Sequence, residues 1–249
     1  MRNLENKVVL ITGGNSGIGF ATAKEFIENG AKAIITGRRK EAVAQAANEI
    51  GAIGYVADQA SLQDIENLSL EIKSRFGSID ILFINAGITG EGGLIDTASE
   101  VNFDAVMDIN LKGSYFTLSR FIPLLRDGGS VVILSSNVAA LNMPQSSIYQ
   151  ASKAAVNSIA RTAAMELAGR KIRVNTVSPG PTRTEVLNKN YDQQTVEDIW
   201  TQLAASSPLQ KIGTAEDVAK MVVYLSSDAA SYITGADFVL DGGMRINHS

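Results

Sequence analysis

The chain has 249 residues, of which 45% are hydrophobic and 19% are charged, and its formal net charge is −4. This composition is typical of a globular protein, and the interspersed acidic and basic residues leave no basic face for nucleic-acid phosphates. Because the sequence contains no cysteine, it excludes disulfides, thiolate nucleophiles and cysteine zinc sites, and it favours a cytoplasmic location.

The N-terminal segment 1–6 is short and polar, and no apolar run approaches the ~18 residues that a membrane span requires. We therefore expect neither export nor membrane insertion.

The first half of the chain alternates short apolar runs with amphipathic stretches. Strands are predicted at 7–12, 33–36, 53–57 and 79–85. The first helix is expected to end at Asn29, with Gly30 following it, and the next spans 41–50. Ser61, with Asp64 three residues later, is predicted to cap a helix that ends at Phe76.

The second half continues the alternation, with a long helix from about Glu100, an alanine-rich helix at 147–167 and strands at 131–134, 172–177 and 238–240. Right-handed crossovers between successive strands give a parallel sheet. The predicted fold is α/β, Rossmann-like and doubly wound, with seven parallel strands, helices on both faces and a single domain over 1–249.

An irregular stretch at 182–207 follows a strand end and contains Leu187, Tyr191, Trp200 and Leu203. One interpretation is a substrate lid, because ligands of open α/β sheets bind beyond the carboxyl ends of the strands. The other is a surface helical insertion that packs its own apolar residues.

A glycine-rich turn at 12–19, Thr-Gly-Gly-Asn-Ser-Gly-Ile-Gly, joins the first strand to its helix. Glycines there let the backbone approach a pyrophosphate, and the helix N-terminus can receive its charge. A turn in this location favours a dinucleotide, whereas glycines elsewhere often serve only packing.

The second strand ends in Gly37-Arg38-Arg39, where an acidic residue would accept hydrogen bonds from the ribose of NAD. A guanidinium at this point can instead hold a 2′-phosphate. The sequence therefore predicts NADP(H), and the solvated alternative carries more weight for Arg39 than for Arg38.

With these motifs the chain resembles the short-chain dehydrogenase/reductase family, in its compact single-domain form, over nearly its whole length. The resemblance rests on the glycine turn, on Asp58, on the Asn-Ala-Gly motif at 85–87, and on Tyr149 with Lys153. It implies catalytic roles for Tyr149 as acid/base, Ser136 on the substrate oxygen, Lys153 on the nicotinamide ribose and Asn110 on a relay water. The expected cofactor-binding residues are Gly13, Asn15, Ser16, Gly17, Ile18, Gly19, Arg38, Arg39, Asp58, Gln59, Asn85, Ala86, Gly87, Tyr149, Lys153, Pro179, Gly180, Thr182 and Thr184; the last two are candidates to bond the carboxamide.

Physical chemistry supports the pairing of Tyr149 with Lys153, because residues four apart share one face of a helix. A cation ~4 Å from a phenolate, at an effective dielectric constant of ~20, favours it by about 4 kcal/mol and is expected to lower the phenol pKa by up to roughly three units. Ser136 ends a strand near the same crevice. Ser135 is its nearest rival, and only the thirteen-residue spacing to Tyr149, taken from the resemblance, separates them.

Three residues depart from the family pattern: Ile84, Gln59 and Asn137. None is an expected catalytic group, but Asn137 is a candidate to reach the substrate pocket, where it would argue against a purely apolar specificity. The only histidine, His248, cannot supply a Ser-His-Asp triad or a histidine metal site, so no metal is expected.

We expect a small-molecule ketone or alcohol as substrate, and no nucleic-acid or membrane partner. A 3-oxoacyl-[acyl-carrier-protein] reductase is the alternative, although Asp127 and the net charge do not indicate a basic docking surface. A nucleotide-sensing protein without turnover is more distant. The resemblance further implies a homotetramer paired through the helices at 101–118 and 147–167, which carry apolar or small residues on more than one face.

Overall fold

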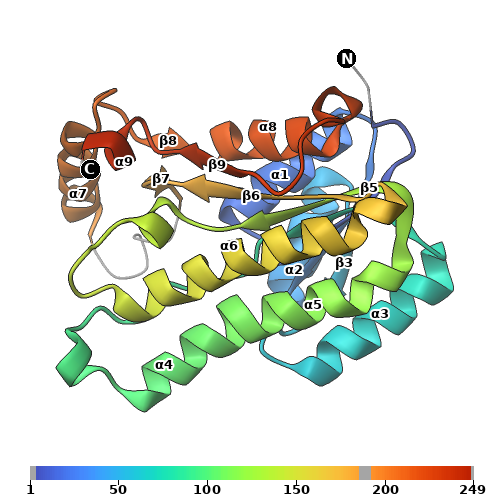
Figure 1. The fold of residues 1–249 in the computed structure, drawn as a ribbon, viewed down its shortest axis with the longest axis horizontal. Helices are drawn as coiled ribbons and strands as arrows, with labels where there is room; N and C mark the ends of the chain where they lie inside the picture. Colours follow the sequence, from blue (N-terminus) through green and yellow to red (C-terminus); the bar gives the residue numbers. More distant parts are fainter. Residues whose placement is uncertain (1–3, 185–191, 248–249) are drawn as a thin grey trace.

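A parallel sheet forms the centre of the computed structural model, which describes residues 4–184 and 192–247. Its seven strands lie in the order β3-β2-β1-β4-β5-β6-β9 (Figure 1). They span β1 Val8–Ile11, β2 Lys32–Gly37, β3 Ile53–Val56, β4 Ile79–Ile84, β5 Leu125–Leu134, β6 Arg173–Pro179 and β9 Asp237–Leu240. The predicted doubly wound, Rossmann-like α/β fold is confirmed.

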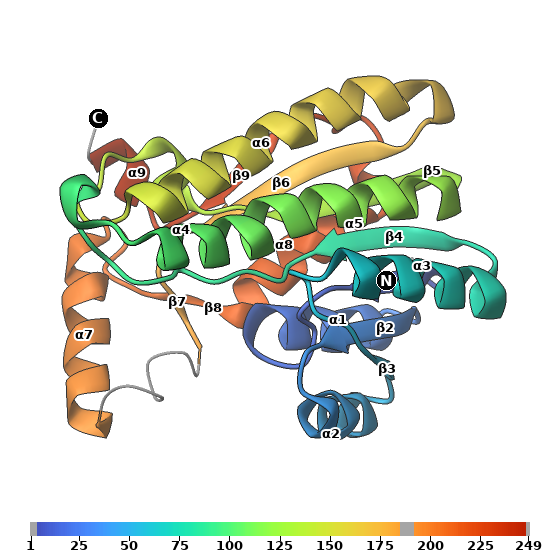
Figure 2. The ribbon, with the colours of Figure 1, turned by 90° about the horizontal axis from the view of Figure 1, so that it is seen from below.

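Helices cover both faces of this sheet because its central strands β1 and β4 are buried on both sides. One face carries α1 Gly17–Glu28, α2 Lys40–Ile50 and α8 Ala215–Ser226, whose apolar residues pack on Val9 and Ile11 of β1. The other carries α3 Leu62–Phe76, α4 Glu100–Met107, α5 Ser114–Phe121 and α6 Ser147–Leu167, and its core includes Leu10, the alternate residue of the same strand (Figure 2).

The strand order reverses between β1 and β4, which pair in parallel register with Val9 opposite Ile81. The connections that follow β1 and β4 run to opposite sides of the sheet, which leaves a crevice at the carboxyl ends of these two strands. Open α/β sheets bind ligands in such a crevice. The glycine turn and the Asn-Ala-Gly segment follow these two strands directly.

Helix ends follow the expected capping chemistry. The Ser61 side chain accepts a hydrogen bond from the Asp64 amide at the start of α3, and Asn29 ends α1 ahead of Gly30, whose φ is +91°. Both predicted helix ends are confirmed.

Several elements differ from the sequence expectation. β5 begins at Leu125 rather than Val131, and the long helix from Glu100 is interrupted by a π-helical turn, Asp108–Gly113, between α4 and α5. Helix α8 was not predicted, although Thr214 and Asp217 form a reciprocal capping box at its start.

The stretch at 182–207 contains a short strand and a helix. β7 Thr182–Arg183 pairs with β8 Gly213–Thr214, and α7 Gln193–Ser206 buries Val196 and Trp200. The described part is therefore helical, and the choice between a substrate lid and a surface insertion stays open. Leu187, Tyr191 and His248 lie outside the described residues.

Helix α7 and the C-terminal helix α9 Met244–Asn247 both lie at the carboxyl end of the sheet (Figure 1). Among the described residues, no helix is long and apolar enough to cross a membrane.

Candidate active site

The glycine turn is held against the crevice by its neighbour Asn85. Gly13 and Gly17 have φ of +64° and +53°, a conformation that favours glycine. The Asn85 amide donates to the carbonyl oxygens of Thr12, at 2.9 Å, and Gly13, at 3.1 Å. A side chain at Gly19 would collide with the Gly13 carbonyl, so the helix can start this close to the turn only because residue 19 is glycine.

The N-terminus of α1 keeps free backbone donors, because the N-cap Ser16 is exposed and makes no side-chain cap bond. Ile18 packs instead against Ala215 and Ala219 of α8. The Ile18 side chain therefore packs α1 against α8, and only the Ile18 backbone is available to a ligand.

The end of β2 lies beside the same turn, since the Asn15 side chain closely approaches Gly37. Arg38 and Arg39 follow, both exposed, and neither guanidinium has a hydrogen-bond or ion-pair partner among the described residues. The Ala57 amide donates to the Gly37 carbonyl, which places Asp58 on the adjoining strand end.

Asp58 and Gln59 both take part in local hydrogen bonds. The Asp58 carboxylate accepts from the Ala60 amide at 3.0 Å, and the Gln59 amide nitrogen donates to the Thr117 hydroxyl of α5 at 3.1 Å. Because Gln59 is buried in this contact, its side chain is directed away from the crevice.

The Asn-Ala-Gly segment connects the cofactor side of the crevice with the expected catalytic side. The Thr12 hydroxyl oxygen accepts from the amides of Asn85 and Ala86. A Cβ at Gly87 would lie 3.1 Å from Asn110 Oδ1 and 3.4 Å from Lys153 Nζ. The bare glycine backbone therefore leaves a planar group free to lie next to these side chains.

Asn110 is fully buried in the π-helical turn, where the extra residue rotates its side chain toward β4. Its Oδ1 accepts from the Ile88 amide and its Nδ2 donates to the Ile88 carbonyl, both at 2.8 Å. Nδ2 also donates to the Ser152 hydroxyl at 3.1 Å, and that hydroxyl donates to the Tyr149 carbonyl. Asn110 is thereby tied to the helix that carries Tyr149.

Ser136, Tyr149 and Lys153 converge at the carboxyl end of β5. Ser136 and Tyr149 are hydrogen-bonded through their side chains, and the Lys153 ammonium lies 5.9 Å from the centroid of the Tyr149 ring. Lys153 is buried and donates to the Leu134 carbonyl at 2.7 Å.

The expected lowering of the Tyr149 pKa is wrong for this arrangement. Burial raises the pKa of Tyr149, and the hydrogen bond with Ser136 offsets only part of that effect. Burial also lowers the pKa of Lys153 to about 8. The charge of Lys153 favours the phenolate, but the cost of desolvating both groups outweighs that effect.

The two candidate serines have separate partners. The Ser135 hydroxyl donates to the Lys153 carbonyl at 3.3 Å, so it holds strand to helix, whereas Ser136 meets Tyr149. Asn137 is buried, and its amide donates to Asp241 at 3.4 Å. It faces the start of α9, so the expectation that it reaches the substrate pocket is wrong.

The segment after β6 returns to the glycine turn. The Thr182 hydroxyl donates to the Gly180 carbonyl at 3.0 Å, which closes the turn that follows Pro179. Thr184 lies against Gly17, with its Cγ2 3.5 Å from where a Cβ of Gly17 would be. Thr184 is thus placed beside the glycine turn, and Thr182 is engaged within its own loop.

Beyond Tyr149 lies a cleft of about 350 Å³ whose walls are the segments after β4 and β5. They include Thr89–Gly93, Asn102, Val138, Met143 and Gln145–Ile148. These walls are not predicted from the sequence. Both are long irregular segments that follow strand ends, and the same feature indicated a binding role for the stretch at 182–207. No described residue of that stretch lines this cleft.

Comparison with known proteins gives the family. The family model described as Enoyl-(Acyl carrier protein) reductase matches residues 13–245. A 3alpha-hydroxysteroid dehydrogenase of Mediterraneibacter gnavus is 36% identical over 97% of this chain and 98% of its own. The chain belongs to the short-chain dehydrogenase/reductase family.

Other members of this short-chain dehydrogenase/reductase family are similarly related. The 3-oxoacyl-[acyl-carrier-protein] reductase FabG of Thermotoga maritima is 36% identical over 98% of this chain and 99% of its own. Versicolorin reductase 1 of Aspergillus parasiticus is 34% identical over 96% and 97%. The crystal structure of gox2181 matches with a TM-score of 0.91 at 28% identity and covers 98% of both chains. The protein is therefore an oxidoreductase of a family that uses a nicotinamide cofactor and small-molecule substrates.

Proposed function

We propose that the protein is an NADP(H)-dependent oxidoreductase that interconverts a carbonyl and an alcohol, with Tyr149 as the acid/base. The observation that carries this proposal is the hydrogen bond between the Tyr149 hydroxyl and Ser136. Tyr149 also lines a cleft, and the ammonium of buried Lys153 lies 5.9 Å from the centroid of its ring. A protein that only binds a nucleotide does not need Ser136, Tyr149 and Lys153 to lie together.

The residues of the crevice fit a dinucleotide. Positive φ at Gly13 and Gly17 turns the backbone toward the free donors of α1, and the bare backbone at Gly87 faces Asn110 and Lys153. When bound, the reduced nicotinamide supplies the hydride for the carbonyl carbon.

Tyr149 gives its proton to the carbonyl oxygen as the carbon–oxygen π bond opens, and Ser136 orients that oxygen by a hydrogen bond. Because burial raises the pKa of Tyr149, the phenol keeps its proton in the neutral range, as carbonyl reduction requires. Lys153 stabilises the phenolate that remains and would bond the nicotinamide ribose. Asn110 positions the Ile88 backbone and binds the relay water.

The preference for NADP(H) rests on Arg38. It follows Gly37 next to Asn15 of the glycine turn and has no protein partner among the described residues. A guanidinium in that place can form charge-assisted hydrogen bonds with a 2′-phosphate.

We further propose a homotetramer that pairs through α4, α5 and α6. Val101, Phe103, Tyr115 and Met165 are large apolar residues exposed on these helices, and burial between subunits would remove them from water. Light scattering tests the assembly, and a monomer would contradict it. A single domain over 1–249 and a cytoplasmic location stay predictions.

The test is a turnover screen of ketones and aldehydes with NADPH, repeated with NADH and with Tyr149→Phe. We expect reduction of some ketones by the wild-type protein, and a loss of about 10²- to 10⁴-fold in kcat with Tyr149→Phe. Cofactor binding, followed by nicotinamide fluorescence, should survive the substitution. Binding of NADPH without turnover of any carbonyl compound would contradict the proposal and favour a nucleotide sensor.

A 3-oxoacyl-[acyl-carrier-protein] reductase is the second candidate, favoured by the 36% identity to FabG of Thermotoga maritima. Efficient reduction of an acetoacetyl group on a carrier protein, with free ketones inactive, would support it instead.

A further inference from the structure

The cleft beside Tyr149 adjoins a second, larger hollow at the carboxyl end of the sheet. The inner chamber, of about 350 Å³, and the outer chamber, of about 780 Å³, share walls at Gly93, Met143, Gln145 and Ser147. Chambers of this size hold drug-sized molecules rather than single small rings. A substrate whose carbonyl meets Tyr149 therefore has room to extend outward.

Hydrogen bonds hold both walls in place. The Asn102 side chain accepts from the Glu91 amide at 2.8 Å and donates to the Glu91 carbonyl at 2.9 Å. The Gly93 amide donates to the Gln145 carbonyl at 3.0 Å and so joins one wall to the other. The Gln150 side chain donates to the Met143 carbonyl at 2.6 Å. The two chambers are thus pre-formed by the chain itself.

The outer chamber exposes large apolar side chains to solvent. Leu94, Ile95 and Met143 are 55%, 81% and 49% exposed, and Pro144 lies among them. Apolar residues that gather around one hollow commonly mark a binding surface. Their continuity with the Tyr149 cleft identifies a small-molecule substrate as the occupant.

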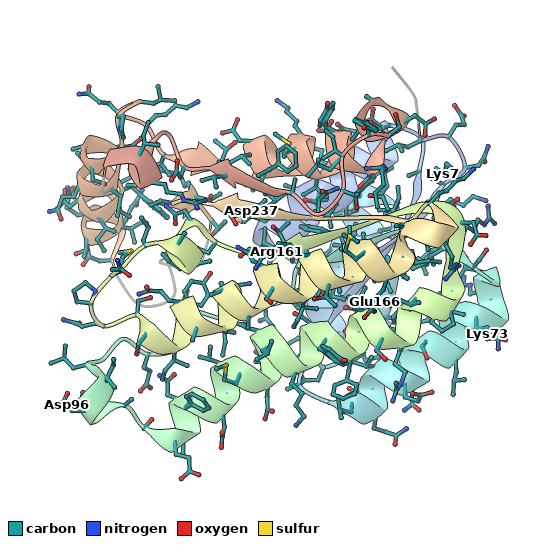
Figure 3. The ribbon with its side chains drawn as sticks, in the orientation of Figure 1. Lys7, Lys73, Asp96, Arg161, Glu166 and Asp237 are labelled. Carbon is teal, nitrogen blue, oxygen red and sulfur yellow. The ribbon has the colours of Figure 1, made fainter. Side chains whose placement is uncertain are left out.

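The charge of the walls restricts that substrate. Among the described residues that line the two chambers there is no Lys, Arg or His, whereas Glu91 and Asp96 contribute two carboxylates. Asp96 lies at this end of the molecule, far from Lys73 and Lys7 (Figure 3). An anionic group in either chamber would meet repulsion and find no cationic side chain among the described lining residues to pair with.

We propose that the substrate is an electrically neutral carbonyl compound with a bulky apolar body that reaches from Tyr149 into the outer chamber. This rests on the proposed carbonyl–alcohol activity and adds the class of compound to it. Apolar contacts with Leu94, Ile95 and Met143 select the body, and Glu91 and Asp96 disfavour acids.

The test compares three ketones that share one reacting group: cyclohexanone, phenylcyclohexanone and the same compound with a carboxylate on its phenyl ring. We expect kcat/KM for phenylcyclohexanone to exceed the values for both other ketones by at least about tenfold, as one extra buried apolar group allows. Equal or better turnover of cyclohexanone or of the carboxylate would overturn the inference while leaving the proposed function intact. If none of a wider panel of ketones is reduced with either cofactor, the proposed function itself fails.

Two matched leucines provide the variants. Leu94→Asp places a charge in the outer chamber, and Leu70→Asp places the same charge on α3, where Leu70 is 57% exposed. Leu94→Asp should reduce the advantage of phenylcyclohexanone over cyclohexanone at least about fivefold, and Leu70→Asp should leave it unchanged. An equal fall for all three ketones in Leu94→Asp, or a change of oligomeric state, would overturn the assignment.

Asp96→Lys tests the role of charge separately. We expect the carboxylate ketone to gain about tenfold relative to phenylcyclohexanone at low salt, and the gain should shrink as salt screens the pair. An unchanged ratio of the two ketones would contradict the role given to Asp96.

Discussion

Arg38→Asp tests the choice of cofactor. A charge-assisted hydrogen bond from a guanidinium to a 2′-phosphate is worth roughly 1.5 to 3 kcal/mol. Because each 1.4 kcal/mol is about tenfold, NADPH should exceed NADH in kcat/KM by about ten- to hundredfold. Arg38 is exposed, so the lower end of this range applies at physiological salt.

The substitution removes that bond and adds a repulsion. A carboxylate ~6 Å from a doubly charged phosphate, in water, costs about 1.4 kcal/mol, or roughly another tenfold. The carboxylate can also accept hydrogen bonds from the ribose of NADH. The NADPH/NADH ratio should therefore fall by about 10² to 10³ and reverse in favour of NADH.

Steady-state kinetics with both cofactors and one ketone measure this ratio. Arg39→Asp should change it less, because Arg39 is the N-cap residue of α2. Lys73→Asp is the control, because it makes the same change of two charges near the C-terminal end of α3, at the opposite end of the sheet (Figure 3). It should leave the NADPH/NADH ratio unchanged. Equal efficiency of the two cofactors in the wild-type protein, or no reversal in Arg38→Asp, would remove the role given to Arg38.

Three further substitutions probe the site. Burial lowers the folded-state pKa of Lys153 to about 8, below its unfolded value. The free energy of unfolding of the wild-type protein, measured relative to Lys153→Met, should therefore rise between pH 8 and about 10, by up to ~1.4 kcal/mol per pH unit. Urea unfolding that shows no such slope would contradict the effect of burial on Lys153. Asn110→Ala should cost about 2 to 4 kcal/mol of unfolding free energy, because the half-buried Ile88 backbone and the buried Ser152 hydroxyl lose their partner. Asn102→Ala, which breaks a similar pair of bonds at exposed Glu91, should cost about 1 kcal/mol, and equal costs of the two substitutions would contradict the importance of burial. Gly19→Ala should weaken NADPH binding at least about tenfold, because the added methyl group displaces the Gly13 carbonyl. An unchanged Kd in a fluorescence titration would argue against the glycine turn as the dinucleotide site.

The sequence predicts the frame of the site because its signals are local. Alternation of apolar runs and amphipathic stretches is sufficient for the order of the strands, and the capping chemistry of Ser61 fixes the start of α3. Tyr149 and Lys153 lie on one helix, so their common face follows from spacing alone.

The features that the sequence does not predict depend on tertiary contacts. The directions of Gln59 toward Thr117 and of Asn137 toward Asp241 are set by partners 58 and 104 residues away. The π-helical turn at Asn110 is stabilised by the Ile88 backbone, and no helical periodicity indicates it. The pKa of Tyr149 depends on how much water the folded chain excludes, which spacing cannot give.

The most direct test of Tyr149 as the acid/base is a single-turnover measurement with Tyr149→Phe, with NADPH bound in advance and phenylcyclohexanone as substrate. We expect hydride transfer to slow by about 10²- to 10⁴-fold while the Kd for NADPH stays the same, because the substitution removes only the proposed proton donor. Transfer at the wild-type rate in this variant would contradict the role of Tyr149.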